Sequence, residues 1–259
     1  MSQLDAIVAG RLRDVRQRSQ RLPLEVLRAA ARRRPAPRDF ARALRRGAPS
    51  VVAEFKRCSP SAGVIGDRDP AATARAYQLG GAAALSILTE PTWFRGGLDD
   101  LVMARNASGL PVLRKDFIVD EYQIWEAAEA GADAILLIVA VLTGDELAAF
   151  RSLAESLGMC AVVEVHDEDE ARRALRAGAT IVGINNRDLR SMRVDLSIAL
   201  RVRRGLPESC TVVAESGYAN AAELATCADA GIHAVLIGES LLRAQDPAAA
   251  LAALRGVPA

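Results

Sequence analysis

Eight short apolar runs rich in β-branched residues recur along the chain, and an Ala- and Leu-rich amphipathic stretch lies between successive runs. The runs cover residues 51–55, 83–89, 111–115, 134–140, 160–165, 180–185, 211–216 and 234–238. Parallel strands that are buried on both faces have this continuous apolar character, and helices connect them. The pattern therefore predicts a chain of alternating β-strands and α-helices.

The residues at the ends of the predicted helices agree with this interpretation. Several stretches between the runs open with Asp or Thr, which cap helix N-termini, and end in a glycine, namely Gly80, Gly131, Gly158, Gly178 or Gly231. Eight strand-helix units in 259 residues are typical of a closed parallel (β/α)₈ barrel. An open doubly wound sheet is the alternative, but no Gly-x-Gly-x-x-Gly follows the first run. We expect one α/β domain over residues 1–259, a single (β/α)₈ TIM barrel.

Residues 1–46 precede the first run and should form extra N-terminal helices that cover the barrel, with a break at the Pro-Ala-Pro of 35–37. Residues 1–50 carry 13 arginines against four acidic groups, whereas the rest of the chain has 20 basic and 28 acidic groups. Apolar residues recur at helical spacing among these arginines. We therefore interpret the arginines as solvated faces of docked helices and expect no nucleic-acid partner.

Composition narrows the class of protein further. The four cysteines form no Cys-x-x-Cys pair and there are only two histidines, which argues against a structural zinc site. The longest apolar run, 134–142, is too short to cross a bilayer, and no signal peptide precedes the arginine-rich start. We expect a cytoplasmic protein with reduced thiols and no membrane partner.

The chain has only two lysines against 31 arginines, and both lysines stand at the ends of apolar runs. Lys56 follows the first run and Lys115 ends the third. A guanidinium cannot release its proton near neutral pH, whereas a partly buried lysine can. The two lysines are therefore candidates for proton transfer, and chance placement is the alternative.

The active site of a (β/α)₈ barrel lies at the C-terminal ends of its strands, where this chain is polar. The alternation of a strand puts one set of strand-end side chains on the same face: Glu54, Lys56, Lys115, Glu164, Asn185 and Glu215. If this face is the barrel interior, three carboxylates and two ammonium groups converge on one mouth. Such a cluster spreads pKa values as acid-base catalysis requires, and a purely structural charge network is the alternative.

The last two runs end in glycine- and hydroxyl-rich segments, Glu-Ser-Gly-Tyr at 215–218 and Ile-Gly-Glu-Ser at 237–240. Loops after the seventh and eighth strands of such barrels often bind phosphate through backbone N–H groups. A Ser-Pro-Ser segment at 59–61 follows the first run. Together these segments predict a phosphorylated small-molecule substrate.

Motifs along nearly the whole chain resemble those of the indole-3-glycerol-phosphate synthases of tryptophan biosynthesis. They include Glu-Phe-Lys-Arg-Cys-Ser-Pro-Ser at 54–61, Leu-Arg-Lys-Asp-Phe-Ile-Val-Asp at 113–120, Gly-Ile-Asn-Asn-Arg-Asp-Leu at 183–189, Glu-Ser-Gly at 215–217 and Ile-Gly-Glu-Ser-Leu at 237–241. The resemblance implies a carboxy-lyase that closes the ring of 1-(2-carboxyphenylamino)-1-deoxyribulose 5-phosphate. The reaction releases carbon dioxide and water and needs no metal or organic cofactor.

The resemblance also implies roles for individual residues. Lys115 looks like the general acid that protonates the substrate carbonyl, and Glu164 looks like its carboxylate partner. Glu54 and Lys56 would assist decarboxylation and dehydration. The remaining roles concern binding: Asn185 and Glu215 for the ribulose hydroxyls, Arg187 for another substrate contact, and Ser59, Ser216, Gly217, Gly238 and Ser240 for the phosphate.

Two aromatic residues, Phe94 and Phe117, are candidates for holding the anthranilate ring, with core filling as the alternative. We expect Cys58 to be inert packing and His166 to serve as a helix cap or a surface residue. We expect a monomer, and a partner among the enzymes of the pathway stays open.

Two other functions compete with this interpretation. A sugar-phosphate isomerase on a similar barrel would share the phosphate loops but needs only one acid-base pair, against which the two lysines and three carboxylates argue. An interaction or nucleic-acid-binding protein with a relict barrel would use the arginine-rich segment, but the set of strand-end charges is complete.

Overall fold

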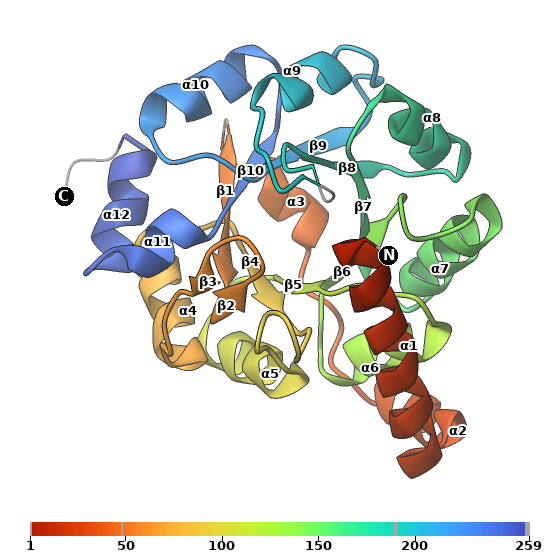
Figure 1. Ribbon diagram of the computed structural model, residues 1–259. Coiled ribbons are helices and arrows are strands. Elements are labelled where there is room, and N and C mark those ends of the chain that lie inside the picture. The colour runs from red at the N-terminus through yellow and green to blue at the C-terminus, as the bar shows by residue number, and fades with distance from the viewer. Residues whose placement is uncertain (1, 48, 189–190, 257–259) are drawn as a thin grey trace.

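Strands and helices alternate around a closed barrel in the computed structural model, which describes residues 2–47, 49–188 and 191–256 (Figure 1). The barrel strands are β1 (Ser50–Phe55), β4 (Ala84–Leu88), β5 (Val112–Lys115), β6 (Ala134–Ile138), β7 (Cys160–Val165), β8 (Ile181–Asn185), β9 (Thr211–Glu215) and β10 (Ala234–Ile237). All neighbours pair in parallel, and β1 closes the ring by pairing with both β4 and β10. The predicted (β/α)₈ barrel is confirmed, and the open sheet is excluded.

Each predicted apolar run forms a barrel strand, with small differences at the ends. The run at 134–140 stops being a strand at Ile138, because the backbone N–H groups of Val141 and Leu142 turn back to the carbonyl oxygen of Ile138. A hairpin of β2 (Cys58–Ser59) and β3 (Gly63–Val64) in the loop after β1 was not predicted.

The helices that follow strands lie outside the barrel and face the apolar outer side of the strands (Figure 1). Those that follow strands are α4 (Pro70–Leu79), α5 (Leu98–Ala107), α6 (Glu121–Glu129), α7 (Gly144–Ser156), α8 (Glu168–Arg176), α9 (Ser197–Arg203), α10 (Ala221–Asp229), α11 (Glu239–Arg243) and α12 (Pro247–Leu254). The predicted Asp and Thr caps are present, for example at Asp69, Asp167 and Thr143. Of the predicted helix-ending glycines, all except Gly80 have a positive φ angle.

Three helices precede the barrel, as expected: α1 (Gln3–Arg21), α2 (Leu24–Ala31) and α3 (Phe40–Leu44). The predicted break at 35–37 lies between α2 and α3, and a second break at Pro23 separates α1 from α2. Phe40 and Leu44 of α3 are buried against the barrel interior. The short helix α3 therefore packs against side chains of the barrel interior.

The barrel interior contains alternate residues of the strands. Val52, Leu113, Val162 and Val213 belong to one buried cluster that is separate from the core between strands and helices. Each of them lies two positions before a polar strand-end residue, so the side chains of those residues continue along the same inner face. The expectation that this face is the barrel interior is confirmed.

The interpretation of the N-terminal arginines as solvated holds for some of them and is wrong for others. Arg13, Arg16 and Arg32 are exposed, but the Arg11 side chain is completely buried and pairs with Asp116 at 2.8 Å. Arg11 follows Ile7 by one helical turn and lies on the buried stripe of α1 rather than on its solvated face. A buried guanidinium is tolerated here because a buried carboxylate compensates it.

Other arginines of this segment dock it to the barrel. Arg34 donates hydrogen bonds to three carbonyl oxygens, those of Ala128, Ala132 and Leu157. A planar guanidinium can reach several acceptors at once, which an ammonium on a flexible stem does less well. Arg34 therefore ties the segment before the barrel to the C-terminal ends of α6 and α7.

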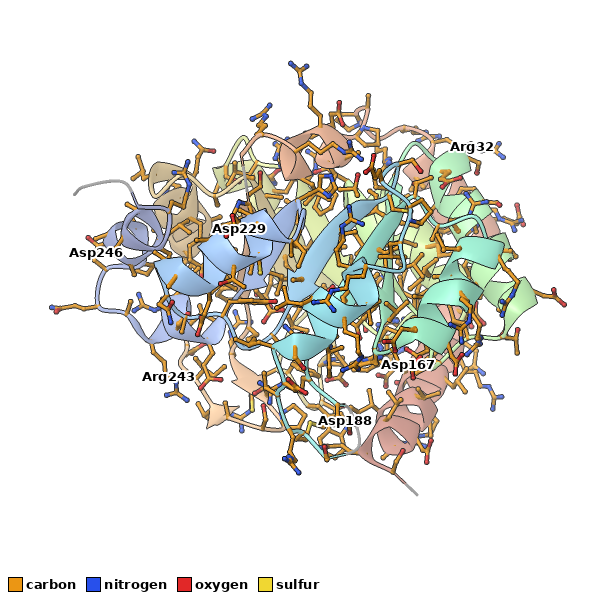
Figure 2. The ribbon with its side chains drawn as sticks, turned by 90° about the horizontal axis from the view of Figure 1, so that it is seen from above. Arg32, Asp167, Asp188, Asp229, Arg243 and Asp246 are labelled. Carbon is orange, nitrogen blue, oxygen red and sulfur yellow. The ribbon has the colours of Figure 1, made fainter. Side chains whose placement is uncertain are left out.

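A view turned by 90° from that of Figure 1 shows which segments lie at the same end of the barrel (Figure 2). Asp188, in the loop after β8, and Arg243 of α11 lie at the same edge as α1, whereas Arg32 lies toward the opposite edge. The C-terminal strand ends and α1 therefore meet at one face. Within the described part of the chain, no helix is both long and apolar enough to span a membrane.

Candidate active site

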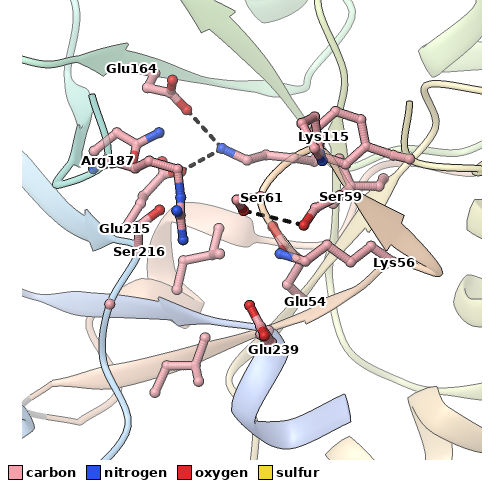
Figure 3. Close-up of a pocket in the computed structure, with 18 of the residues that line it drawn as sticks. Glu54, Lys56, Ser59, Ser61, Lys115, Glu164, Arg187, Glu215, Ser216 and Glu239 are labelled. Carbon is pink, nitrogen blue, oxygen red and sulfur yellow. Dashed lines mark hydrogen bonds and ion pairs between the residues drawn. The ribbon is translucent and has the colours of Figure 1, made fainter. Parts of the chain in front are cut away.

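A cavity of about 410 Å³ opens at the C-terminal ends of the strands. It is lined by every residue that the sequence nominated: Glu54, Lys56, Ser59, Phe94, Lys115, Phe117, Glu164, Asn185, Arg187, Glu215, Ser216, Gly217, Gly238 and Ser240. Its volume lies within the range usual for small-molecule sites. Side chains that are far apart in the sequence therefore meet in one pocket (Figure 3).

Lys115 stands at the centre of the charged cluster (Figure 3). Its Nζ donates to Glu164 Oε2 at 2.8 Å and to Glu215 Oε2 at 2.5 Å. The side chain of Lys115 is 12% exposed, and those of the two glutamates are 2% exposed. One ammonium is thus shared by two carboxylates that are almost completely removed from water.

This sharing separates the pKa values of the two glutamates. Burial acts to raise the pKa of Glu164, but Lys115 and His166 outweigh it and lower that pKa to about 2. Burial, only partly offset by Lys115, raises the pKa of Glu215 to about 7, and the negative charge of Glu164 adds to the rise. For Lys115 burial lowers the pKa, but the two carboxylates outweigh it and the net direction is upward. Near neutral pH the cluster holds an ionised Glu164 beside a Glu215 that is close to titration.

A second ammonium-carboxylate pair lies on β1 and the loop that follows it. Lys56 Nζ donates to Glu54 Oε1, and both side chains are largely buried. Asn185 on β8 lines the same cavity and acts to lower the pKa of Glu164, and its Oδ1 accepts from the backbone N–H of Arg187 at 3.0 Å. The pocket thus presents two ammonium-carboxylate groups, Lys56 with Glu54 and Lys115 with Glu164 and Glu215.

The nominated phosphate residues line the cavity on the loops after β9, β10 and β1, which are consecutive strands of the barrel. Ser240 Oγ is buried and, among the described residues, has no hydrogen-bond partner. Ser216 has a φ of 69°, a left-handed conformation that is strained for a residue with a side chain. A buried hydroxyl without a partner and a strained backbone in the lining of the same cavity are features of a ligand-binding site.

The two nominated glycines have additional structural roles. Gly217 has a φ of 93°, and a Cβ atom there would lie 2.5 Å from Val194 and 2.8 Å from Leu196. At Gly238 a Cβ atom would lie 2.6 Å from Glu54 Oε1. A side chain at either position would therefore disturb protein neighbours as well as an anion in the pocket.

The two nominated aromatic rings lie together. The ring centroids of Phe94 and Phe117 are 6.1 Å apart with an interplanar angle of 38°. Glu90 organises the loop that carries Phe94, because its carboxylate accepts the backbone N–H groups of Thr92, Trp93 and Phe94. Glu90 thus acts through backbone hydrogen bonds that shape this loop.

Some lining residues were not nominated from the sequence. Leu4 and Ile7 of α1 line the cavity, so the first helix contributes to the pocket wall. Their spacing on one helical stripe was visible, but the stripe alone does not indicate what it packs against. Arg243 also lines the cavity, one helical turn after Ser240.

The prediction that His166 is a helix cap or a surface residue is wrong. Its side chain is only 16% exposed and lies between two carboxylates, with Nε2 at 3.5 Å from Glu164 Oε1 and Nδ1 at 3.0 Å from Glu170 Oε2. Asp167 caps α8 instead. The alternation of the strand placed the side chains of His166 and Glu164 on the same face. The hydrogen bonds of His166 to Glu170 on α8 hold its ring beside Glu164.

No group of three or more His, Cys, Asp or Glu side chains within residues 2–47, 49–188 and 191–256 is arranged to hold a metal ion. The four cysteines are free, with Cys210 and Cys227 buried.

Comparison with known proteins points to one family. The model of the family described as indole-3-glycerol phosphate synthase matches residues 4–254. Proteins of that name from Mycolicibacterium vanbaalenii and Mycobacterium avium are 48% and 49% identical to this chain over 252 residues. Each alignment covers 97% of this chain and 93% of the relative.

Solved structures of lower identity share the fold. The thiamine phosphate pyrophosphorylase from Pyrococcus furiosus superposes with a TM-score of 0.60 at 18% identity, covering 80% of this chain and 93% of that chain. A chain of the tryptophan synthase a2b2 complex from the same organism gives a TM-score of 0.60 at 13% identity, covering 80% of this chain and 98% of that chain.

Proposed function

Because the chain belongs to the indole-3-glycerol phosphate synthase family, we propose that it converts 1-(2-carboxyphenylamino)-1-deoxyribulose 5-phosphate to indole-3-glycerol phosphate, carbon dioxide and water. This reaction belongs to tryptophan biosynthesis. The observation that carries the proposal is the pairing of each lysine with a strand-end glutamate around one pocket, at Lys56 with Glu54 and at Lys115 with Glu164 and Glu215.

Ring closure is the first chemical step. The aromatic carbon that bears the carboxylate forms a bond to the ketone carbon of the ribulose chain, and the ketone oxygen takes up a proton. Lys115 is placed to supply this proton, because its ammonium lies in the pocket and is held by two carboxylates. Glu164, which stays ionised, stabilises the positive charge that develops on the substrate.

Loss of carbon dioxide and then of water completes the reaction. The bond from the ring to the carboxylate breaks, and its electron pair returns to the aromatic ring. Dehydration then needs a proton for the leaving hydroxyl and a base for the proton lost from the neighbouring carbon. Lys56 with Glu54 forms an acid-base pair that meets this demand across the pocket from Lys115.

Binding groups surround these two pairs. We assign the phosphate to Ser59, Ser216 and Ser240 with the backbone at Gly217 and Gly238, supported by the unpartnered hydroxyl of Ser240. Phe94 and Phe117 form an apolar wall for the anthranilate ring. Asn185 and Glu215 remain for the hydroxyl groups of the ribulose chain, and Arg187 for a further contact to the substrate.

We further propose that residues 1–259 work as one domain, because α1 supplies Leu4 and Ile7 to the pocket. The enzyme would act as a cytoplasmic monomer without a cofactor. Binding to nucleic acid is disfavoured by the use of Arg11, Arg34 and Arg38 in contacts within the protein.

Incubation with 1-(2-carboxyphenylamino)-1-deoxyribulose 5-phosphate tests the function directly. Indole absorbance and fluorescence should rise with the wild-type protein and should not rise with Lys115→Ala. A protein that isomerises sugar phosphates but leaves this substrate unchanged would contradict the proposal and favour the competing isomerase.

A further inference from the structure

His166 links the acid-base cluster to a carboxylate outside the proposed machinery. Its Nδ1 lies 3.0 Å from Glu170 Oε2, and the same oxygen accepts the backbone N–H of His166 at 2.8 Å. Nε2 points to the other side, 3.5 Å from Glu164 Oε1, and is buried without a hydrogen-bond partner among the described residues. The imidazole therefore stands between two carboxylates, one on α8 and one in the pocket.

The position of both nitrogens favours the protonated ring. Nδ1 must carry a proton to bond to the Glu170 carboxylate. In a neutral ring Nε2 would then direct its lone pair at the oxygen of Glu164, which is unfavourable in a site with little water. A second proton on Nε2 turns this repulsion into attraction.

The charges around the ring agree with this assignment. Glu164 on β7 and Glu170 on α8 lie against the ring, the negative charge of Glu215 on β9 also acts on it, and Lys115 on β5 is the cation that pairs with Glu164 and Glu215. Burial lowers the pKa of His166, but these carboxylates outweigh it, and the pKa lies above its ordinary value of 6.5.

We propose that His166 is a positioning residue whose imidazolium keeps Glu164 ionised at the moment when Lys115 has given its proton to the substrate. The inference rests on the proposed ring closure. Once Lys115 is neutral, Glu164 loses its nearest cation, and a buried carboxylate without a cation tends to take up a proton. His166 supplies the remaining positive charge, so Glu164 can still stabilise the cationic intermediate.

The charge of His166 can be measured without substrate. The chain has only two histidines, so the proton NMR signals of the imidazoles in a pH titration are assigned by His166→Gln alone. His233 provides an internal reference, because burial, with Arg45 and Arg203, lowers its pKa. We expect His166 to titrate at a higher pH than His233, and Glu170→Gln to lower the pKa of His166. If the pKa of His166 is not raised and does not change in Glu170→Gln, the inference is overturned.

The consequence for catalysis is tested with His166→Gln, which keeps a polar side chain but removes the charge. We expect kcat at neutral pH to fall about tenfold, KM to stay within about twofold, and the acidic limb of kcat to move up by about one pH unit. His233→Gln is the matched control and should leave the profile unchanged, since His233 bonds to the backbone N–H of Val212 rather than to the pocket. If the pH profile of kcat in His166→Gln is the same as in the wild-type protein, the inference is overturned.

If the wild-type protein forms no product, the proposed function fails, and the NMR titration still decides the charge of His166.

Discussion

Gly238 lies so close to Glu54 that a Cβ atom at position 238 would be 2.6 Å from Glu54 Oε1. The two residues belong to neighbouring parts of the barrel, because β10, which ends at Ile237, pairs with β1. The same oxygen of Glu54 accepts the hydrogen bond from Lys56. The glycine that the sequence assigned to the phosphate loop therefore also leaves room for an acid-base pair.

Gly238→Ala should displace the Glu54 carboxylate and lower kcat by about tenfold or more, because misplacement of a catalytic group by a fraction of an ångström is costly. Steady-state kinetics measures this loss. Gly144→Ala is the matched control, since a Cβ atom at Gly144 meets no atom within 4 Å. Equal kinetics in both variants would show that Glu54 tolerates the displacement.

Gly238→Asp should add loss of anion binding to this effect. Inorganic phosphate should inhibit the wild-type enzyme competitively and raise its melting temperature, since a ligand that binds only the native state stabilises it. The melting temperature of Gly238→Asp should hardly respond to phosphate. Equal shifts in both proteins would place the anion elsewhere, for example on the arginine-rich N-terminal segment.

Lys115→Arg should be about as inactive as Lys115→Ala, although it keeps the positive charge. A guanidinium cannot donate its proton near neutral pH, and general acid catalysis contributes on the order of 10² to 10⁴ in rate. Single-turnover formation of the indole product measures the effect. Turnover of Lys115→Arg within a few fold of the wild-type value would show that Lys115 supplies only charge.

Glu164→Gln should fold normally and lose kcat by a similar order, because an amide has nearly the same shape but cannot carry the negative charge. The melting temperature and the steady-state constants separate the two effects. An increase of KM at an unchanged kcat would instead make Glu164 a binding group.

Glu215 makes stability depend on pH in a specific window. Its pKa is raised from 4.5 to about 7, so the folded state holds this proton more tightly than the unfolded state. The associated stabilisation is present below about pH 4.5 and is lost as the pH rises toward 7. We expect the free energy of unfolding of the wild-type protein to fall relative to that of Glu215→Gln across this window, by an amount on the order of 1 to 3 kcal/mol. Parallel stability curves from urea titrations at several pH values would contradict this.

Arg34→Lys should destabilise the protein by about 1 to 3 kcal/mol without changing kcat, because an ammonium cannot serve all three carbonyl acceptors of Arg34. Arg33→Lys, at the exposed neighbouring position, is the matched control and should be nearly neutral. Urea denaturation compares the two variants. A loss of activity at unchanged stability would mean that the segment acts on the pocket rather than on the fold.

Local signals in the sequence determined the strands, their inward faces and the helix caps. The alternation of apolar and polar positions placed Glu54, Lys115, Glu164 and Glu215 on the barrel interior, because the period of a strand is two and a parallel strand in a closed barrel has only one inner face. The motif resemblance added the family, which the match over residues 4–254 shows.

Only the tertiary structure decided which charges pair and how strongly each side chain is buried. It placed one ammonium between Glu164 and Glu215, put His166, expected as a helix cap or a surface residue, next to Glu164, and buried Arg11 against Asp116. These relationships join residues from different strands and helices. The spacing of residues in the sequence does not determine such distances, because they depend on barrel closure and on the angle at which each helix packs against the strands. The pKa values follow from those distances and from the exclusion of water.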